Sequence, residues 1–174
     1  MPEPIVPDTK DWTWVLERPC AECGFDPQAY TVADFPRLMH DTAMVWSQVL
    51  LRPDVRERPT PSVWSPLEYA CHVRDVHRLF AERVELMLNE DEPRFANWDQ
   101  DETATASSYA EQDPAEVDAD LVEAAGHVAG LYATVTPEAA QRRGSRSNGS
   151  EFSVTTLGIY HLHDVVHHVH DVGA

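Results

Sequence analysis

Histidines are concentrated at the carboxyl end of the chain: nine occur in 174 residues, and five of them lie in the last fourteen. His163 and His167 are four residues apart, so a helix would place them on one face, one turn apart, with their Cβ atoms about 6 Å from each other. Two imidazoles at this spacing can bind the same divalent metal ion. His170 follows His163 by seven residues, shares the face and is a substitute ligand.

A third ligand must come from elsewhere in the chain, because a transition-metal site usually has at least three protein ligands and, when it is catalytic, an open position. We take His72 as the best candidate, since it lies in the opening turns of a clearly marked helix. His40, His77 and His127 are alternatives. The competing interpretation is that these histidines are hydrogen-bonded core residues, or an exposed run that binds nickel without a physiological role.

The three cysteines form a weaker pattern. Cys20 and Cys23 make a C-x-x-C pair, but a zinc site needs two further ligands, and none completes it within the same segment. A redox pair usually starts a helix in a βαβ unit, which this segment lacks. We therefore expect a structural or incidental role for the pair, with redox chemistry or a second metal as alternatives. Cys71, next to His72, is expected in the core.

Four segments carry apolar residues at three- and four-residue intervals, as amphipathic helices do. They cover about residues 32–51, 66–89, 114–135 and 154–172. The second segment has the clearest start, because Ser65 is placed as N-cap, Pro66 as the first helical residue and Glu68 as the partner in a capping box. Helices of similar length with short or moderate links predict an all-α fold, a four-helix bundle.

The segments outside these helices are expected to be irregular. Residues 1–30 are interpreted as an irregular N-terminal arm added to a bundle that spans 31–174, and residues 12–16 alternate as a short strand or an extended arm does. The polar connection 90–113 is long enough to predict a functional or packed loop. Residues 141–151 are interpreted as a loop with three arginines.

The charge of the chain disfavours several classes of partner. Thirty acidic and thirteen basic residues give a net charge of -17, and such a surface repels nucleic-acid backbones and anionic membranes. No apolar run approaches the roughly 18 residues of a transmembrane helix. Met1–Lys10 lacks the basic start and apolar stretch of a signal peptide. We therefore expect a cytoplasmic protein that acts on a small molecule, as a monomer or a homodimer.

Two motifs resemble the DinB-like superfamily of four-helix metal proteins, which includes mycothiol-dependent maleylpyruvate isomerases and bacterial thiol transferases. The motifs are Trp64–Val73, which contains Ser-Pro-Leu-Glu-Tyr-Ala-Cys-His, and the histidine-rich Tyr160–His168. The resemblance covers roughly residues 30–174. In addition, Arg18–Asp26 resembles a segment that is present in one subgroup of the superfamily.

The resemblance implies a divalent ion, which is zinc or sometimes nickel or another divalent ion in characterised relatives. One histidine early in the second helix and two histidines, four residues apart, in the last helix hold this ion. In this sequence those positions are His72, His163 and His167. Asp164 and Glu68 are candidates to orient a ligand imidazole through a hydrogen bond. Glu68 is also a candidate general base.

Characterised relatives use such an ion to handle a small thiol such as mycothiol or bacillithiol. A metal lowers the pKa of a bound thiol, so the resemblance implies a metal-dependent S-transferase or isomerase. Arginines are expected to hold carboxylates of the substrate or cofactor, namely Arg74, Arg83 and Arg142, with Arg143 and Arg146 as further candidates. The alternatives are a metal-dependent hydrolase, or a non-catalytic metal-binding or stress-response module.

Overall fold

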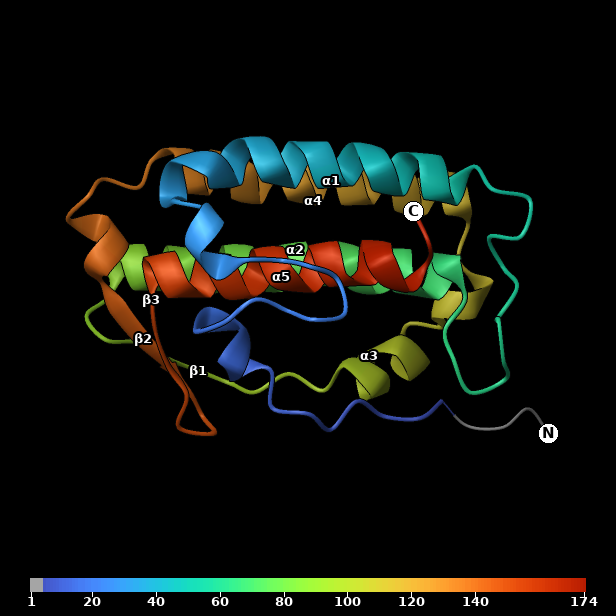
Figure 1. Cartoon of the computed structure of the whole chain (residues 1–174), viewed down its shortest axis with the longest axis horizontal. Coiled ribbons are helices and arrows are strands. Elements are labelled where there is room, and N and C mark those ends of the chain that lie inside the picture. The colour runs from blue at the N-terminus through green and yellow to red at the C-terminus, as the bar shows by residue number, and fades with distance from the viewer. Residues whose placement is uncertain (1–4) are drawn as a thin grey trace.

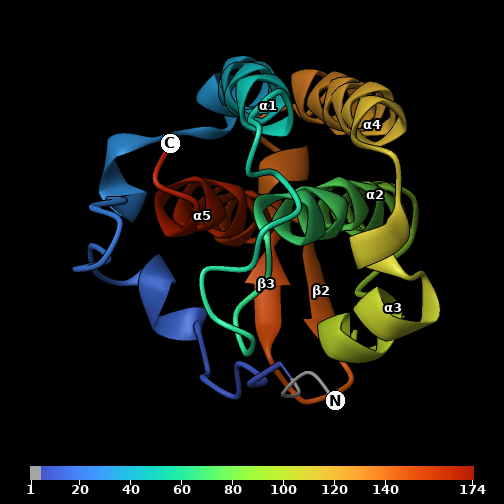
Figure 2. The same ribbon diagram turned by 90° about the vertical axis from the view of Figure 1, so that its right-hand side faces the viewer.

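The four predicted helices are present in the computed structural model, which describes residues 5–174. They are α1 (Phe35–Leu50), α2 (Pro66–Asn89), α4 (Pro114–Ala133) and α5 (Val154–Asp171). α4 packs against α1 and α2, and α5 packs against α2 and α1. The helices therefore form two layers, with α1 and α4 above α2 and α5 (Figure 1), as the end-on view in Figure 2 shows. The prediction of an all-α four-helix bundle is confirmed.

Local sequence determines where these helices begin. Ser65 caps α2: its hydroxyl oxygen accepts from the amide of Glu68, and the Glu68 carboxylate accepts from the amide of Ser65 at 2.9 Å. The predicted capping box is thus confirmed. Asp113 caps α4 and Ser153 caps α5 in a similar way. Each cap satisfies backbone amides in the first turn that have no helical partner.

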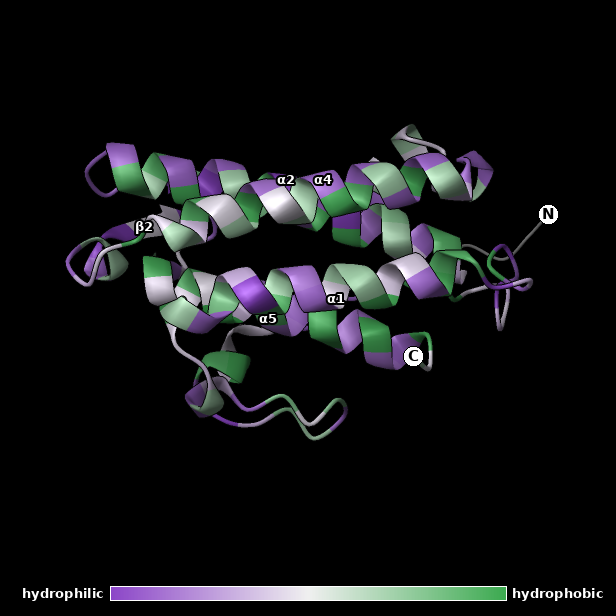
Figure 3. Cartoon of the chain, turned by 90° about the horizontal axis from the view of Figure 1, so that it is seen from above, coloured by the Kyte–Doolittle hydropathy of each residue, from purple (hydrophilic) through white to green (hydrophobic). Residues whose placement is uncertain are grey.

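One face of each long helix is apolar, and these faces meet in one core. On α1 the buried residues recur at three- and four-residue intervals: Phe35, Met39, Ala43, Trp46, Val49 and Leu50. Hydrophobic and hydrophilic stretches alternate along α1 and α5 in Figure 3. None of the helices within residues 5–174 is long and apolar enough to span a lipid bilayer.

A small sheet lies beside α2 and α5 (Figure 2) and was not predicted from the sequence. Its strands β1 (Arg94–Phe95), β2 (Arg143–Arg146) and β3 (Glu151–Ser153) follow the order β1-β2-β3, with β1 parallel and β3 antiparallel to β2. The sequence predicts loops in both places, because such short strands carry no alternating apolar pattern. A short helix, α3 (Gln100–Ala106), lies in the connection between α2 and α4.

The N-terminal arm, residues 5–34, packs along α5 (Figure 2). Its segment Thr13–Leu16 is a 3₁₀ helix, which corrects the prediction of a strand or an extended arm. The reason is local: the Asp11 carboxylate accepts from the amide and hydroxyl of Thr13, at 3.0 and 2.8 Å, and starts a turn. Val15 in this turn is fully buried, so the arm contributes to the core.

Gly158 lets α5 approach the start of α1, and a larger side chain would have no space there. A Cβ added to Gly158 would lie 2.2 Å from Cε2 of the buried Phe35 ring. We therefore expect Gly158→Ala to lower the free energy of unfolding by about 1–3 kcal/mol in urea denaturation.

Gly130→Ala is the matched control, because nothing lies within 4 Å of the Cβ position of Gly130 on α4. Alanine is the better helix former, so this variant should gain up to about 1 kcal/mol. Equal losses in the two variants would contradict the close packing of Phe35 on Gly158.

Candidate metal centre

One group of possible metal ligands joins α2 to α5. His72 projects from α2, Asp164 and His168 project from α5, and one candidate ligand atom of each lies within 4.8 Å of the other two. The Nε2 atoms of His72 and His168 lie 3.3 and 3.6 Å from the same oxygen, Asp164 Oδ1. Asp164 and His168 are one helical turn apart, so both side chains reach the same neighbour. We call these three residues the His72 group.

Neighbouring side chains orient the imidazoles of the His72 group. His168 Nδ1 lies 2.8 Å from Asp171 Oδ2, so the Asp171 carboxylate accepts the Nδ1–H and leaves the Nε2 lone pair facing Asp164. The His72 ring stacks on Trp98, with ring centroids 5.4 Å apart and 12° between the planes. Rings held in this way are already arranged to bind an ion.

The charges of the His72 group also suit a divalent ion. Burial lowers the pKa of His72 and favours its neutral ring. For His168, burial also opposes the charged form, but the hydrogen bond to Asp171 and the nearby Asp164 raise its pKa, so a metal ion must displace a proton from this ring. Burial opposes the charged form of Asp164, but its hydrogen bond to His72 and the nearby His168 hold the pKa of this carboxyl well below its usual range. Neutral imidazole and ionised carboxylate are the forms that bind metal. Two imidazoles with one carboxylate occur in catalytic zinc sites and in non-haem iron sites that keep open positions.

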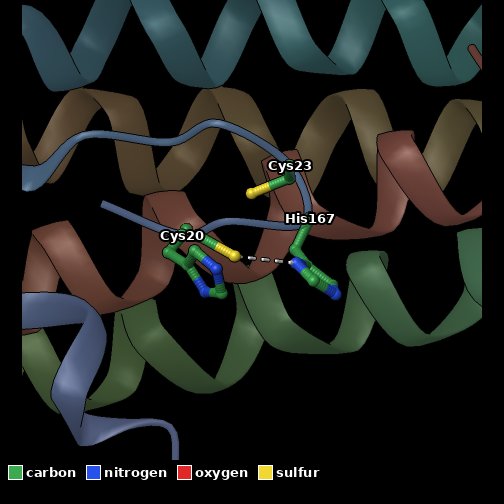
Figure 4. A group of neighbouring side chains, drawn as sticks. Cys20, Cys23 and His167 are labelled. Atoms are coloured by element: carbon green, nitrogen blue, oxygen red, sulfur yellow. Dashed lines mark hydrogen bonds between the residues drawn. The ribbon is translucent and has the colours of Figure 1, made fainter. Parts of the chain in front are cut away.

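A second group of possible ligands joins the N-terminal arm to α5. It consists of Cys20, Cys23, His163 and His167, and one candidate ligand atom of each lies within 4.8 Å of the others. Cys20 Sγ and His167 Nδ1 are 3.7 Å apart, and Figure 4 shows them facing each other with the Cys23 thiol beside them. We call these four residues the Cys20 group.

The predicted triad of His72, His163 and His167 is therefore divided between the two groups. Consecutive residues of a helix are 100° apart, and α5 turns the face with Asp164 and His168, not the one with His163 and His167, toward α2. Asp164 and His168 have the same four-residue spacing in the sequence as His163 and His167, with a carboxylate in place of one imidazole. This spacing could have indicated Asp164 and His168 as a second pair of candidate ligands. Asp164, predicted to orient a ligand, is itself a candidate ligand. The substitute ligand His170 is exposed and belongs to neither group.

Each group contributes two residues to the wall of one cavity of about 850 Å³: Asp164 and His168 from the His72 group, and His163 and His167 from the Cys20 group. Its walls come from the N-terminal arm, α2, the segment that leads into α3, the β2–β3 hairpin and α5. Aromatic and acidic side chains line it, among them Trp12, Trp64, Tyr69, Trp98, Asp99 and Asp101. A cavity of this volume is typical of small-molecule sites.

Two arginines, Arg83 and Arg146, line the same cavity. Their side-chain hydrogen bonds go to neutral oxygens, Ala96 O at 3.0 Å and Ser150 Oγ at 3.2 Å, and the Nε of each is buried without a partner. Within residues 5–174, neither guanidinium forms an ion pair. Burial and the neighbouring Arg146 lower the pKa of Arg83 to about 10, so Arg83 is still a cation at neutral pH.

Of the three other predicted substrate arginines, Arg143 is exposed and does not line the cavity, and Arg74 and Arg142 support the fold. Arg74 pairs with Asp75 at 2.9 Å and donates to the side chain of Gln112 at 2.7 Å. Arg142 donates to the backbone oxygen of Met87 at 2.6 Å. Neither side chain lines the cavity, so the structure does not bring these two arginines to the candidate ligands. Residue type alone could not separate these arginines from the two that face the cavity.

The Glu68 carboxylate also binds residues other than the candidate ligands. Its carboxylate accepts from the Ser65 amide and pairs with the Arg58 guanidinium. The structure therefore does not bring Glu68 to the candidate ligands, because the capping box and the ion pair use both of its oxygens.

The remaining histidines considered as ligands lie elsewhere. His77 is buried, and its Nδ1 lies 3.0 Å from His161 Nε2, while the Tyr132 hydroxyl lies 3.2 Å from the other nitrogen of His161. This chain of polar contacts is part of the core. His40 and His127 are exposed on the surface.

The sequence profile of the DinB superfamily matches residues 45–172 of the chain. The chain belongs to the DinB superfamily. The resemblance seen in the sequence motifs is thus confirmed, and the matched range covers α2, α4, α5 and the last part of α1.

Among solved structures, YfiT from Bacillus subtilis resembles this DinB-superfamily chain with a TM-score of 0.71. The two share 19% sequence identity, and the match covers 80% of this chain and 82% of YfiT. YfiT is described as a probable metal-dependent hydrolase with an unusual four-helix bundle topology. A likeness at this identity establishes the fold alone. No curated protein sequence matches the chain.

Glu68 should stabilise the start of α2 in a pH-dependent way. Burial opposes its charged form, but the Arg58 guanidinium and the Ser65 amide lower its pKa from the ordinary 4.5. Its contribution is therefore present above about pH 4.5 and is lost as the pH falls through the lower, folded-state pKa. Glu68→Gln should cost about 2 kcal/mol at neutral pH, less than the roughly 3–5 kcal/mol for breaking a fully buried pair, because the Arg58 side chain is 29% exposed.

Urea denaturation of wild type and variant at neutral and at strongly acidic pH measures this effect, and the difference should shrink in acid. Glu82→Gln, an exposed change on the same helix, should stay within about 0.5 kcal/mol of wild type at both. Loss of bound metal in Glu68→Gln without loss of stability would instead indicate that Glu68 acts at the metal centre.

Proposed function

We propose that this chain is a divalent-metal enzyme that joins a low-molecular-weight thiol to a small anionic substrate. The observation that carries the proposal is one cavity lined by Asp164 and His168 of the His72 group and by two arginines, Arg83 and Arg146, which have no acidic partners among residues 5–174. In a chain of net charge -17, two such cations attract a negatively charged ligand to this cavity. Membership in the DinB superfamily, and the metal dependence stated for YfiT, support the metal.

The residues of the His72 group would hold the ion. Such an ion lowers the pKa of a bound thiol or water, so that either becomes a nucleophile near neutral pH. Zinc fits two imidazoles and a carboxylate well, and nickel is the alternative. Asp171 would keep His168 in the tautomer that offers Nε2.

The thiol must come from solution, because the His72 group contains no cysteine. Cys71 is buried in the core, and its thiol points to Tyr109 O at 3.9 Å. This fits the mycothiol-type or bacillithiol-type cofactors that DinB-like relatives use. A volume of about 850 Å³ lies in the upper part of the range of roughly 300–1,000 Å³ for ligand sites, which leaves space for a thiol and an electrophile together.

Hydrolysis is the second candidate function, and Asp101 favours it. Asp101 lines the cavity, and burial together with the nearby Asp99 raises the pKa of this carboxyl. A carboxylate with a raised pKa is a better proton acceptor and suits a general base that activates water. The description of YfiT as a probable metal-dependent hydrolase supports the same alternative.

Thiol transfer is tested by incubating the untagged, metal-loaded protein with a panel of low-molecular-weight thiols and carboxylate-bearing electrophiles. We expect a thioether conjugate, detected by mass spectrometry, and a loss of about 100-fold or more in kcat/KM in His72→Ala. Arg146→Gln should raise KM by about tenfold for the anionic electrophile and leave an uncharged analogue unaffected.

Arg143→Gln is the matched control for the arginine, since Arg143 lies on the same strand, is exposed and does not line the cavity. His170→Ala is the corresponding control for the metal ligand. Cleavage of esters or amides without conjugate formation, together with a loss of activity in Asp101→Asn, would contradict thiol transfer and favour hydrolysis. Absence of turnover with both panels would indicate a metal-binding module.

A further inference from the structure

The Cys-x-x-Cys segment of the arm forms a tight turn that presents both thiols to α5. The amide of Gly24 donates to Cys20 O at 2.8 Å, and the amide of Cys20 donates to Phe25 O at 2.8 Å. Gly24 has a φ of +75°, a conformation that side-chain-bearing residues rarely adopt, so glycine is required directly after Cys23. The turn is therefore built to place Cys20 and Cys23 together (Figure 4).

The two histidines opposite these thiols each have a ring nitrogen that is available to bind a metal ion. His163 is only 4% exposed, and its Nε2 is buried without a hydrogen-bond partner. His167 turns Nδ1 toward Cys20, while its Nε2 lies 3.6 Å from Glu22 and 3.7 Å from Asp171. Carboxylates near Nε2 favour the tautomer that keeps the lone pair on Nδ1.

We propose that Cys20, Cys23, His163 and His167 bind a structural zinc ion, separate from the ion of the His72 group. Two thiolates and two imidazoles form a tetrahedral donor set that zinc prefers, and four protein ligands leave no open position for substrate. As the two Zn–S bonds form, each thiol releases its proton to solvent, so that two thiolates neutralise the Zn²⁺ charge. A neutral complex suits a place where Cys20, His163 and His167 are at most 7% exposed.

A disulfide between the two cysteines is the other way to use this pair, and it explains less. It would leave the buried Nε2 of His163 without a partner, at the cost of an unsatisfied polar group. It would also not account for the position of His167 beside Cys20. The zinc ion uses all four side chains.

This zinc ion would attach the arm to the helix that carries Asp164 and His168. Trp12 of the arm packs on the rings of His163 and His167, with centroids 5.4 and 4.9 Å apart, and also lines the cavity. The structural ion would therefore fix the position of one wall of the cavity and the orientation of α5 about its own axis. The inference does not depend on the reaction proposed above.

Cobalt substitution of the full-length, untagged protein tests the proposal. A cobalt ion bound by cysteine gives thiolate-to-metal charge-transfer absorption in the near ultraviolet, whereas an imidazole–carboxylate site does not. We expect this absorption in the wild type and in a His72→Ala/Asp164→Ala variant, which lacks only the other site. It should disappear in Cys20→Ser/Cys23→Ser. Cys71→Ala is the matched control and should keep it, since Cys71 lies outside the group.

Zinc content gives an independent measurement, with one equivalent fewer in Cys20→Ser/Cys23→Ser and also one fewer in the His72 variant. If the cysteine variant does not fold, the comparison of wild type with Cys71→Ala still decides the assignment. The proposal is overturned by wild type that binds cobalt without charge transfer, or by absorption that survives loss of both Cys20 and Cys23. A Cys20–Cys23 disulfide in protein purified with its metals would overturn it as well.

Discussion

The rotation of α5 about its own axis is the constraint on which the rest of the site depends. His163 and His167 are one turn apart, as are Asp164 and His168, and the two pairs differ by the 100° between consecutive helical residues. One pair meets the arm and the other meets His72 on α2. A single helix therefore contributes to two groups of candidate ligands. The packing that fixes its orientation about its own axis determines which of these residues can share an ion. The close approach of Phe35 to Gly158 is one of those packing contacts.

The sequence predicted the four long helices well, because their signals are local. The capping box of Ser65 and Glu68, and the apolar periodicity of α1, need no knowledge of the rest of the fold. The sheet was missed because β1, β2 and β3 owe their pairing to neighbours that are distant in sequence, not to their own composition. The turn at Thr13 was missed for a different reason. Its cause is local, a hydrogen bond that the Asp11 carboxylate accepts from the Thr13 amide, but the alternating apolar pattern does not show it.

The candidate site could be predicted only in part, for the same physical reason. The sequence pointed to the last helix, to a four-residue spacing and to His72, and all three recur in the His72 group. The face that α5 turns toward α2, however, depends on the whole core. The missing ligands for Cys20 and Cys23 lie far along the chain, since His167 follows Cys20 by 147 positions. Likewise, Arg83 and Arg146 differ from Arg74 and Arg142 only in the partners that the fold provides.

The most direct measurement is anomalous X-ray diffraction at the zinc absorption edge from crystals of the full-length protein grown with zinc. We expect two separate peaks, one among His72, Asp164 and His168 and the other among the four residues of the Cys20 group. A single peak shared by His72, His163 and His167 would contradict the division of α5 into two ligand faces.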